Sequence, residues 1–474
     1  MNNLIPFDEF SDLWDEVPVV IPDTNAILDL YRNSSLTTEH VLEIFGLISN
    51  QIWIPHQVAE EYQNNYRGVI SGAKKKYDDV TEKVQTTVQK AKNDVNKQFL
   101  RYKGFKFPKI NELGDYINTK ISEIEAEAAR FGDDIIDEIS RNKRMLEDDY
   151  VKTFMDQLEA DGKVGSPFTY SEKIVLITEG DSRYSRKIPP GYEDEKEKDK
   201  KDPIKKTQKF GDLFVWKQLL LHAEENGRPI IFITNDNKED WWVLDKDGNI
   251  VSPRKELLDE FSDYSDQNFT MMGLPEFVGH VAKIINKENT LSFLELNATS
   301  VLDDIVEYKG WEEVLDGNLQ LTSYLIHNGD LQDYVSNPLT DVEIFNFNAS
   351  KLEIDNVELD GTFVSMEGTF TIVVEATISQ YGDRDEQVMI TINGYINAQF
   401  EIDLEKKEDN IKKNTVKLTL GGFDIKNVVY YDQTGDLDES DMDYQGEELE
   451  LCSGCGEYKG RGEFRGSLCN ACED

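Results

Sequence analysis

The sequence predicts an α/β fold with a parallel sheet in its N-terminal part, followed by an antiparallel β domain and a small cysteine module. Three observations support this. Short apolar runs alternate with helical patterns up to residue 287, apolar residues then alternate with polar ones from about residue 340, and all four cysteines lie within the last 23 residues. A chain of 474 residues exceeds what one hydrophobic core usually supports, so several domains are expected.

The parallel sheet is predicted from apolar runs that are short enough for strands and bounded by turn residues. Residues 229–234 (PIIFIT) form the clearest buried strand, because every position is apolar until Thr234. The other predicted strands are residues 18–21, 51–55 and 269–272, and the helices between them are predicted at residues 26–31, from 58 onward, 210–223 and 275–285.

A long helical insertion is predicted over about residues 71–160. This segment is rich in Lys, Glu, Asp and Gln, with apolar residues at helical spacing, and it is interrupted around Gly104 and Pro108. We interpret it as an antiparallel pair of helices that serves for packing or as an arm for homo-oligomer formation. Residues 162–191 are predicted to form a polar loop, and residues 193–209 a charged linker.

In the C-terminal part, apolar residues recur at every second position, as in β-strands. Residues 288–339 are interpreted as a mixed linker region, and residues 340–432 as an antiparallel β domain, sandwich-like or barrel-like. Residues 433–450 are rich in Asp, Glu and Gly, which predicts an acidic linker. The zinc module described below occupies residues 451–474.

The charge balance limits the possible partners. The chain has 93 acidic and 51 basic residues and a net charge of −42, so nucleic acid has to be bound locally and not by a broad basic surface. The first residues carry acids, and no stretch of about 20 apolar residues is present, so we expect a soluble, cytoplasmic protein with no membrane contact. Clustered cysteines exclude a disulfide scaffold and suit a reducing compartment.

Four acidic residues occupy related positions. Asp23 and Asp236 directly follow predicted strands, and Glu61 and Asp212 lie near the starts of predicted helices. Because the carboxyl ends of parallel strands share one edge of a sheet, these side chains should face one crevice. Clustered carboxylates repel each other unless a cation lies between them, which predicts Mg²⁺ or Mn²⁺ and metal-assisted hydrolysis. For each acid the alternative is a structural role, such as a helix N-cap for Asp23 or Asp212, and Glu60 competes with Glu61.

The segments VVIPDTNAILDLY, IWIPHQVAEEY, FGDLFVWKQ and IIFITNDNKEDWW resemble the motif regions of PIN-domain nucleases, in particular the large bacterial PIN-like group with a helical insertion and an IPPGY-type loop. The resemblance covers about residues 10–287, which we take as a PIN-like, Rossmann-like domain. It implies Mg²⁺ or Mn²⁺ ligation by Asp23, Glu61, Asp212 and Asp236, with Asp240 assisting. It also implies supporting roles for Thr24, Asn25, Thr234 and Asn235. Candidate phosphate contacts are Arg183, Arg186, Lys187, Lys238 and Arg254.

The tail contains two Cys-x-x-Cys pairs separated by thirteen residues. This spacing predicts that Cys452, Cys455, Cys469 and Cys472 bind Zn²⁺ as a tetrahedral site of the zinc-ribbon kind. A redox pair is the alternative, but no βαβ pattern surrounds either pair. The module is locally basic, so it is suited to docking nucleic acid or a protein partner, and a purely structural cap is the other interpretation.

The combined prediction is a metal-dependent endonuclease that cuts nucleic acid, RNA more than DNA, in bacterial stress response or phage defence. The alternative from another class is a non-catalytic binding or regulatory protein on the same scaffold, using the β domain or zinc module for partner recognition. A third option is other phosphoryl-transfer chemistry at the metal site. The sequence contains no GxxxxGK[ST] loop for nucleoside triphosphates.

Overall fold

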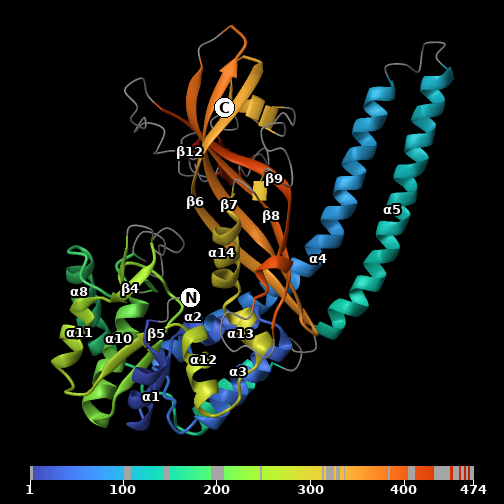
Figure 1. Ribbon diagram of the computed structural model, residues 1–474. Helices are drawn as coiled ribbons and strands as arrows, with labels where there is room; N and C mark the ends of the chain where they lie inside the picture. Colours follow the sequence, from blue (N-terminus) through green and yellow to red (C-terminus); the bar gives the residue numbers. More distant parts are fainter. Residues whose placement is uncertain are drawn as a thin grey trace. The chain divides into compact units, whose positions relative to one another are not determined.

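The computed structural model describes the chain as two units, Asn2–Leu296 and Asn297–Asp474 (Figure 1). The described residues are 4–100, 108–142, 149–193, 208–245, 248–311, 314–315, 325–326, 331–335, 337–382, 385–403, 411–431, 449–451, 458–460, 464–465 and 468–469. The division falls inside the predicted linker region of residues 288–339. Helix α13 (Thr290–Leu296) closes the first unit, and α14 (Ala298–Lys309) opens the second.

A three-stranded parallel sheet forms the centre of the first unit. Its strands are β1 (Val19–Pro22), β2 (Ile230–Ile233) and β5 (Phe269–Met272), in the order β1-β2-β5. β1 and β2 are buried along their whole length, as expected for strands covered on both faces. The prediction of a parallel sheet is therefore confirmed, with the PIIFIT run as its central strand.

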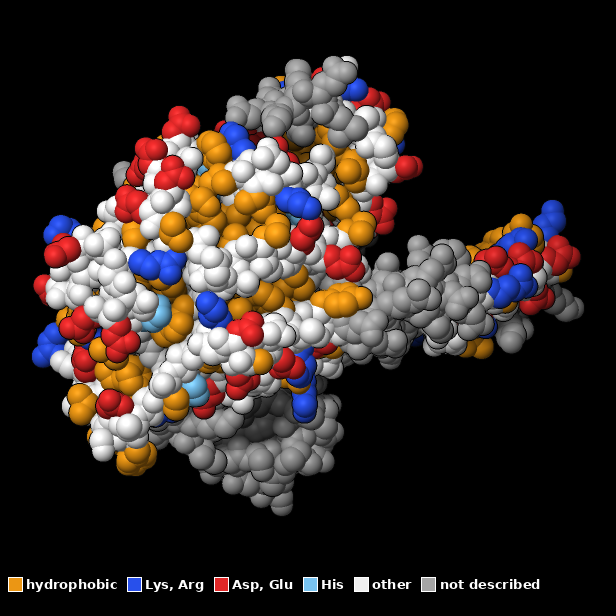
Figure 2. All heavy atoms as spheres, turned by 90° about the horizontal axis from the view of Figure 1, so that it is seen from below, with side chains coloured by type: hydrophobic (Ala, Val, Ile, Leu, Met, Phe, Trp, Pro, Cys, Tyr) orange, Lys and Arg blue, Asp and Glu red, His pale blue; other side chains and the backbone are white. Residues whose placement is uncertain are grey.

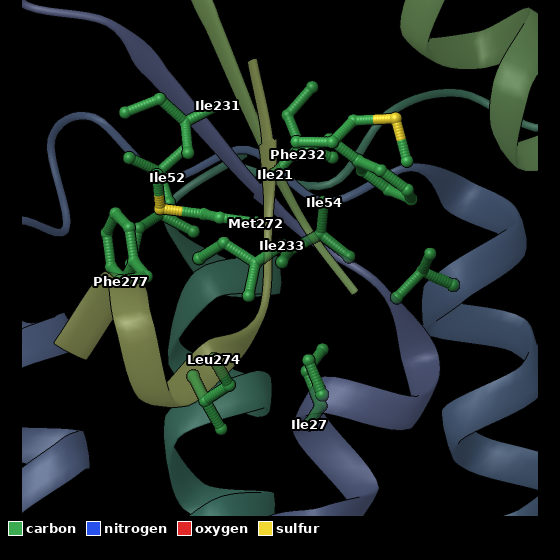
Figure 3. Packing of buried hydrophobic residues seen from close by; sticks show 14 of the residues in the cluster. Ile21, Ile27, Ile52, Ile54, Ile231, Phe232, Ile233, Met272, Leu274 and Phe277 are labelled. Atoms are coloured by element: carbon green, nitrogen blue, oxygen red, sulfur yellow. The ribbon is translucent and has the colours of Figure 1, made fainter. Parts of the chain in front are cut away.

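The predicted strand at residues 51–55 is reduced to two isolated bridges. Ile52 pairs with Val20, and Ile54 pairs with Val164, both in the parallel sense. These bridges continue the sheet beyond β1, and Ile52 and Ile54 are buried. Figure 3 shows that their side chains join those of Ile21, Ile231, Phe232 and Ile233 in one core, together with Met272, Leu274 and Phe277. Burial of such side chains is the main stabilising contribution in this unit.

Helices surround this sheet. Besides α13, they are α1 (Phe7–Asp15), α2 (Thr24–Leu28), the 3₁₀ turns η1 (Asp29–Arg32) and η2 (Gln208–Phe210), α3 (Ser35–Leu47), α7 (Tyr150–Ala160), α8 (Tyr170–Tyr184), α10 (Gly211–Asn226), α11 (Lys255–Ser262) and α12 (Leu274–Ile284). A hairpin of β3 (Trp242–Leu244) and β4 (Ile250–Pro253) follows the central strand. No helix within the described ranges is long and apolar enough to cross a membrane.

The helical insertion is a pair of long helices, α4 (His56–Leu100) and α5 (Pro108–Asn142), which lie side by side (Figure 1). Contacts between them include the ion pair of Lys92 with Glu125 at 2.5 Å and the amide hydrogen bond from Asn118 to Asn96 at 2.7 Å. On the described part of this helical insertion, basic and acidic side chains are interspersed (Figure 2). The predicted hairpin is confirmed, whereas its breaking point near Gly104 lies outside the described residues.

The predicted loop at residues 162–191 is wrong in its central part, because α8 occupies Tyr170–Tyr184. Thr169 and Glu172 form a capping box, in which each side chain accepts a hydrogen bond from the other residue's backbone. This capping box starts a helix in a segment whose glycines and charges suggested a loop. The helix carries Arg183 into the interior of the unit, as described below.

The second unit contains one four-stranded antiparallel sheet in the order β6-β7-β8-β9. The strands are β6 (Leu339–Asp360), β7 (Phe363–Gln380), β8 (Glu386–Glu401) and β9 (Lys417–Tyr430), and the unit also has the 3₁₀ turns η3 (Leu331–Tyr334) and η4 (Lys413–Thr415). Alternate residues of β7 and β8 are buried, which confirms a separate antiparallel region. The expected sandwich or barrel is wrong for the described residues. A single sheet forms there, because each strand pairs only with its sequence neighbours and α14 packs against β6.

The tail contains two short hairpins, β10 (Leu449–Leu451) with β11 (Tyr458–Gly460) and β12 (Phe464–Arg465) with β13 (Leu468–Cys469). Cys452, Cys455 and Cys472 lie outside the described residues, as does the side chain of Cys469. The predicted acidic linker, residues 433–450, also lies outside them except for the start of β10.

Candidate metal site at the carboxyl edge of the parallel sheet

Asp23 lies where β1 ends and α2 begins. Its backbone N–H donates to the carbonyl of Ile233 at 2.8 Å, so the residue stays attached to the neighbouring strand β2. Its side chain caps α2 by accepting a hydrogen bond from the Thr24 N–H at 2.7 Å. Asp23 therefore caps the helix and also lies at the edge of the sheet, because the strand ends where the helix starts.

Two polar side chains fix the second carboxylate oxygen of Asp23. Asn25 donates from Nδ2 to Oδ2 of Asp23 at 2.8 Å, and the Thr234 hydroxyl donates to the same oxygen at 3.1 Å. Thr234 directly follows β2 and is 1% exposed, so this contact joins the ends of two parallel strands. The carboxylate is held in one orientation by both chain segments.

Asn235 ties the same loop to a third element. Its backbone N–H donates to Oδ1 of Asn25 at 3.0 Å, and its Oδ1 accepts from the backbone N–H of Leu274 at 2.9 Å. Its side-chain amide also donates to Asp29 at 2.9 Å. The four residues predicted to support the site, Thr24, Asn25, Thr234 and Asn235, thus form one hydrogen-bonded group around Asp23.

Glu61 lies on the first turns of α4 and faces the same group. Thr24 donates from its hydroxyl to Oε2 of Glu61 at 3.1 Å, and Gln57 donates from Nε2 to Oε1 at 2.8 Å. Glu60 is 45% exposed at its side chain and lies 4.0 Å from Lys173. The structure therefore favours Glu61 over Glu60 as the acidic residue of the site.

Asp236 follows β2 and its side chain is 17% exposed. One carboxylate oxygen accepts the N–H of Lys238 at 3.1 Å, and the other lies 3.3 Å from the Lys238 ammonium group. The backbone is anchored as well, because Trp242 donates from its indole N–H to the carbonyl of Asp236 at 2.6 Å. Of the predicted phosphate contacts, Lys238 is the one that pairs with an acidic residue of the site.

Electrostatics link three of these acids. The pKa of Asp23 is raised to about 7, mainly because burial removes its hydration, next because of the negative charge of Glu61, and to a smaller extent because of Asp236. The hydrogen bonds from Thr24 and Thr234 act in the opposite direction. Asp23, Glu61 and Asp236 are thus close enough for their charges to repel, and a cation between them would relieve that repulsion.

Asp212 lies in the first turn of α10, next to Gly211. A Cβ atom on Gly211 would lie 2.3 Å from Oε1 of Glu61, so the helix start packs directly against that carboxylate. Gly191, with a φ of 89°, lies against Asp212 itself, because an added Cβ would be 3.0 Å from the Cβ of Asp212. The IPPGY segment at residues 188–192 therefore forms a wall beside Asp212.

A second contact fixes α10 relative to α4. Gln218 is 6% exposed, and its side-chain oxygen accepts the backbone N–H of Gln57 at 2.9 Å. Its amide donates to the carbonyl of Ser166 at 3.2 Å. Since Gln57 also holds Glu61, this bridge couples the helix that carries Asp212 to the helix that carries Glu61.

Asp240, which is predicted to assist metal binding, is bonded to the end of the IPPGY segment. It is fully buried, and its Oδ2 accepts the backbone N–H of Glu193 at 3.1 Å. Tyr192 likewise donates from its hydroxyl to the carbonyl of Glu239 at 3.4 Å. These two contacts attach the end of the IPPGY segment to the chain that follows Asp236.

Three of the predicted phosphate contacts are engaged with protein groups. Arg183 is 12% exposed and bonds to Glu179, Glu260 and the carbonyl of Pro189, because α8 directs it inward. Arg254 bonds to Glu256 and to the carbonyl of Glu239. Arg186 donates to Ser182.

Lys187 is the remaining cation of that set. It is 73% exposed and lies 3.9 Å from Glu239. Its ammonium group also lies 6.0 Å from the centre of the Tyr192 ring. The side chains of Lys187 and Lys238 are 73% and 40% exposed, more than those of Arg183 at 12% and Arg254 at 25%.

The four acids fit a hard divalent cation, because they offer carboxylate oxygens and the pKa of the Asp23 carboxyl group is strongly raised. Within the described ranges, no three carboxylate, histidine or cysteine groups form a ready-made metal centre. The geometry thus provides carboxylates gathered at one edge of the sheet, of which Asp23, Glu61 and Asp236 are held by hydrogen bonds, without a preformed cage.

Sequence reasoning missed Gln57, Gln218, Gly191 and Gly211. The glycines precede Tyr192 and Asp212 directly, and glycine beside a site residue is a usable indication of close backbone approach. The glutamines gave no such indication, because their role depends on how α4 and α10 pack.

Comparison with known proteins agrees with this geometry. No curated protein and no solved structure matches the chain. The family model described as a PIN-like domain matches residues 19–257, which is half of the chain and includes β1, β2, the helical hairpin and all four acids. This match corresponds to a nuclease-type superfamily. The chain therefore belongs to the PIN-like domain family.

Proposed function

We propose that this protein is a metal-dependent nuclease that hydrolyses phosphodiester bonds, with RNA a better substrate than DNA. One observation carries the proposal. Asp23 is buried at the carboxyl edge of the parallel sheet, and the charges of Glu61 and Asp236 add to the effect of burial in raising its pKa to about 7. A group of like charges at a ligand-binding edge of a sheet is best explained by a cation that offsets them.

Asp23, Glu61, Asp212 and Asp236 would hold Mg²⁺ or Mn²⁺. When bound, the cation would supply neutralisation of the scissile phosphate and activation of the attacking water. The surrounding residues orient the ligands. Asn25 and Thr234 fix one oxygen of Asp23, while Thr24 and Gln57 fix the two oxygens of Glu61.

Substrate binding would be local. The chain has a net charge of −42, so Lys238 beside Asp236, and Lys187 beside the IPPGY segment, are the candidate contacts for phosphate groups near the cleaved bond. The preference for RNA, and a role in bacterial stress response or phage defence, follow from the family resemblance and the multidomain architecture, and each needs its own test.

The decisive experiment is cleavage of a mixed panel of labelled RNA and DNA, single- and double-stranded, with Mg²⁺, Mn²⁺ or EDTA. Wild type should cleave only with metal, and Asp23→Asn and Asp236→Asn should lose at least about 100-fold in rate. Glu61→Gln and Glu60→Gln form a matched pair, because only Glu61 contacts Thr24 and Gln57. Equal activity in wild type and the Asp variants would overturn the assignment.

Two observations favour the alternative of a non-catalytic binding protein. Lys238 lies 3.3 Å from Oδ2 of Asp236 and partly neutralises it, and no ready-made metal centre exists in the described part of the chain. On this alternative, Mn²⁺ titration would leave the melting temperature unchanged, and nucleic-acid binding would survive in the Asp23→Asn variant without any cleavage in wild type.

We further propose that Cys452, Cys455, Cys469 and Cys472 bind one Zn²⁺. The support is their spacing together with the small apolar content of the tail, which needs a metal to fold. Elemental analysis of purified protein should give one zinc per chain, and Cys455→Ser with Cys472→Ser should abolish it. Retention of zinc in that double variant would refute the site.

A further inference from the structure

A cavity of about 310 Å³ lies on one face of the four-stranded sheet in the second unit. Its residues come from adjacent positions on all four strands, since Lys351 pairs with Thr371, Thr371 with Asn393, and Asn393 with Asp424. These side chains belong to the more exposed face, whereas the alternate positions of β7 and β8 are buried. The volume is within the range of small-molecule sites. Side chains that define the site are Lys351, Thr369, Thr371, Asn393, Tyr395 and Lys426.

An aromatic ring forms one side of the cavity. Tyr395 is 60% exposed, and its ring lies against Gly422, where an added Cβ would be 2.5 Å from the ring. Gly422 has a φ of 62°, and the pairing of β8 with β9 is irregular between Asn393 and Tyr395. The irregular pairing and the glycine together leave space for the ring to lie over the neighbouring strand while much of it remains open to solvent.

A polar atom next to this ring lacks a partner. Oδ1 of Asn393 is buried and has no hydrogen-bond partner within the part of the chain that the structure describes. A buried carbonyl oxygen without a donor costs free energy, and a group that donates a hydrogen bond to it would remove that cost. Asn393 lines the cavity, so a small rotation of its side chain would present this oxygen to an N–H group of a ligand.

Two lysines lie at the edge of the cavity. Lys351 is 74% exposed and pairs with Glu353 at 2.6 Å, and Lys426 is 54% exposed and pairs with Asp424 at 2.8 Å. These pairs are weak because their side chains are exposed, so the lysines can exchange partners at low cost. The cavity is formally neutral, in contrast to the net charge of −42 over the whole chain.

We propose that this cavity binds a nucleotide, with the base stacked on Tyr395, an N–H of the base donated to Asn393, and the phosphate contacted by Lys351 or Lys426. Stacking on an exposed aromatic residue of a sheet, with nearby cations for phosphate, is a general mode of nucleotide recognition. The nucleotide is either free or part of a single strand. The proposal is independent of the carboxylate site, because the cavity lies wholly within Asn297–Asp474.

The test measures binding by the full chain in EDTA, where metal-dependent cleavage cannot occur. One arm uses a fluorescent single-stranded 12-nucleotide RNA, and the other uses the four ribonucleoside monophosphates in calorimetry. Tyr395→Ala is compared with Tyr381→Ala, because Tyr381 is 76% exposed and does not line the cavity. Asn393→Leu tests the amide separately, and thermal melting checks that each variant is folded.

We expect Tyr395→Ala to weaken binding about tenfold, as for loss of one stacked base, and Asn393→Leu to weaken it as well, with no change for Tyr381→Ala. Binding of monophosphates that depends on Tyr395 indicates a free nucleotide, and dependence in the RNA arm alone indicates a strand. Equal affinity of wild type and Tyr395→Ala in both arms would overturn the proposal, even if the carboxylate variants abolish cleavage.

Discussion

The start of α10 packs against the candidate site so closely that a Cβ atom on Gly211 would lie 2.3 Å from Oε1 of Glu61. No side chain can occupy this position unless the carboxylate moves, because real Cβ contacts are essentially never that short. The same oxygen of Glu61 accepts a hydrogen bond from Gln57 at 2.8 Å. A single glycine therefore controls the position of one proposed metal ligand.

Gly211→Ala should displace Glu61 and lower both Mn²⁺ affinity and cleavage rate by about 10- to 100-fold, the usual effect of disturbing a ligand's support. The control is Gly279→Ala in α12, where an added Cβ meets nothing within 4 Å. That substitution should stabilise the protein by about 0.5–1 kcal/mol without affecting cleavage. Similar cleavage rates for the two variants would show that Glu61 is not a ligand.

Asn25→Ala should weaken metal binding by about 10-fold or more, since it removes the donor to Asp23 and the acceptor for the Asn235 N–H. Isothermal titration with Mn²⁺ measures this directly. Asn356→Ala serves as the control, because Asn356 is exposed and its side-chain amide donates to Glu358 at 3.3 Å. Unchanged Mn²⁺ affinity in Asn25→Ala would remove Asp23 from the ligand set.

The raised pKa of Asp23 predicts a pH dependence of stability in metal-free buffer. The folded state holds the proton up to about pH 7, whereas the unfolded state releases it near 3.8, so the folded state loses stability as pH rises through this window. From pH 4 to pH 8, the unfolding free energy of wild type should therefore fall by a few kcal/mol relative to that of Asp23→Asn. Urea unfolding in EDTA measures this change. Adding Mn²⁺ should restore the stability of wild type but not change that of Asp23→Asn. Parallel pH profiles would contradict the assignment.

Glu260 connects two largely buried cations. It lies 2.7 Å from Lys217, bonds to Arg183, and accepts the Trp216 indole N–H at 2.9 Å. Glu260→Ala should destabilise the first unit by about 3–5 kcal/mol, because both cations lose this partner while remaining 12% exposed. Asp259→Ala is the control, since Asp259 is 64% exposed and should contribute less than about 1 kcal/mol. Comparable unfolding midpoints for the two variants would show that the cluster is not stabilising.

The local elements could be predicted because their patterns are local. The apolar run ending at Thr234 is buried on both faces, and the alternation in β7 is reproduced residue by residue. The helix α8 was missed because its capping box at Thr169 lies among glycines and charges typical of loops. The predicted sandwich or barrel was wrong because alternating apolar and polar residues predict a strand with one buried face. The alternation does not predict which element covers that face.

The sequence by itself determined which residue types follow the strands and which segments are helical or extended, since these depend on neighbours along the chain. It also placed Asp23 and Asp236 at one edge, because parallel strands end together. Only the tertiary structure decided that Glu61 and not Glu60 faces them, and that Arg183 is directed toward Glu260. Those outcomes depend on the rotation of α4 and α8 about their axes. That rotation is fixed by packing between segments far apart in sequence, where one residue of helical shift changes the direction of a side chain by about 100°.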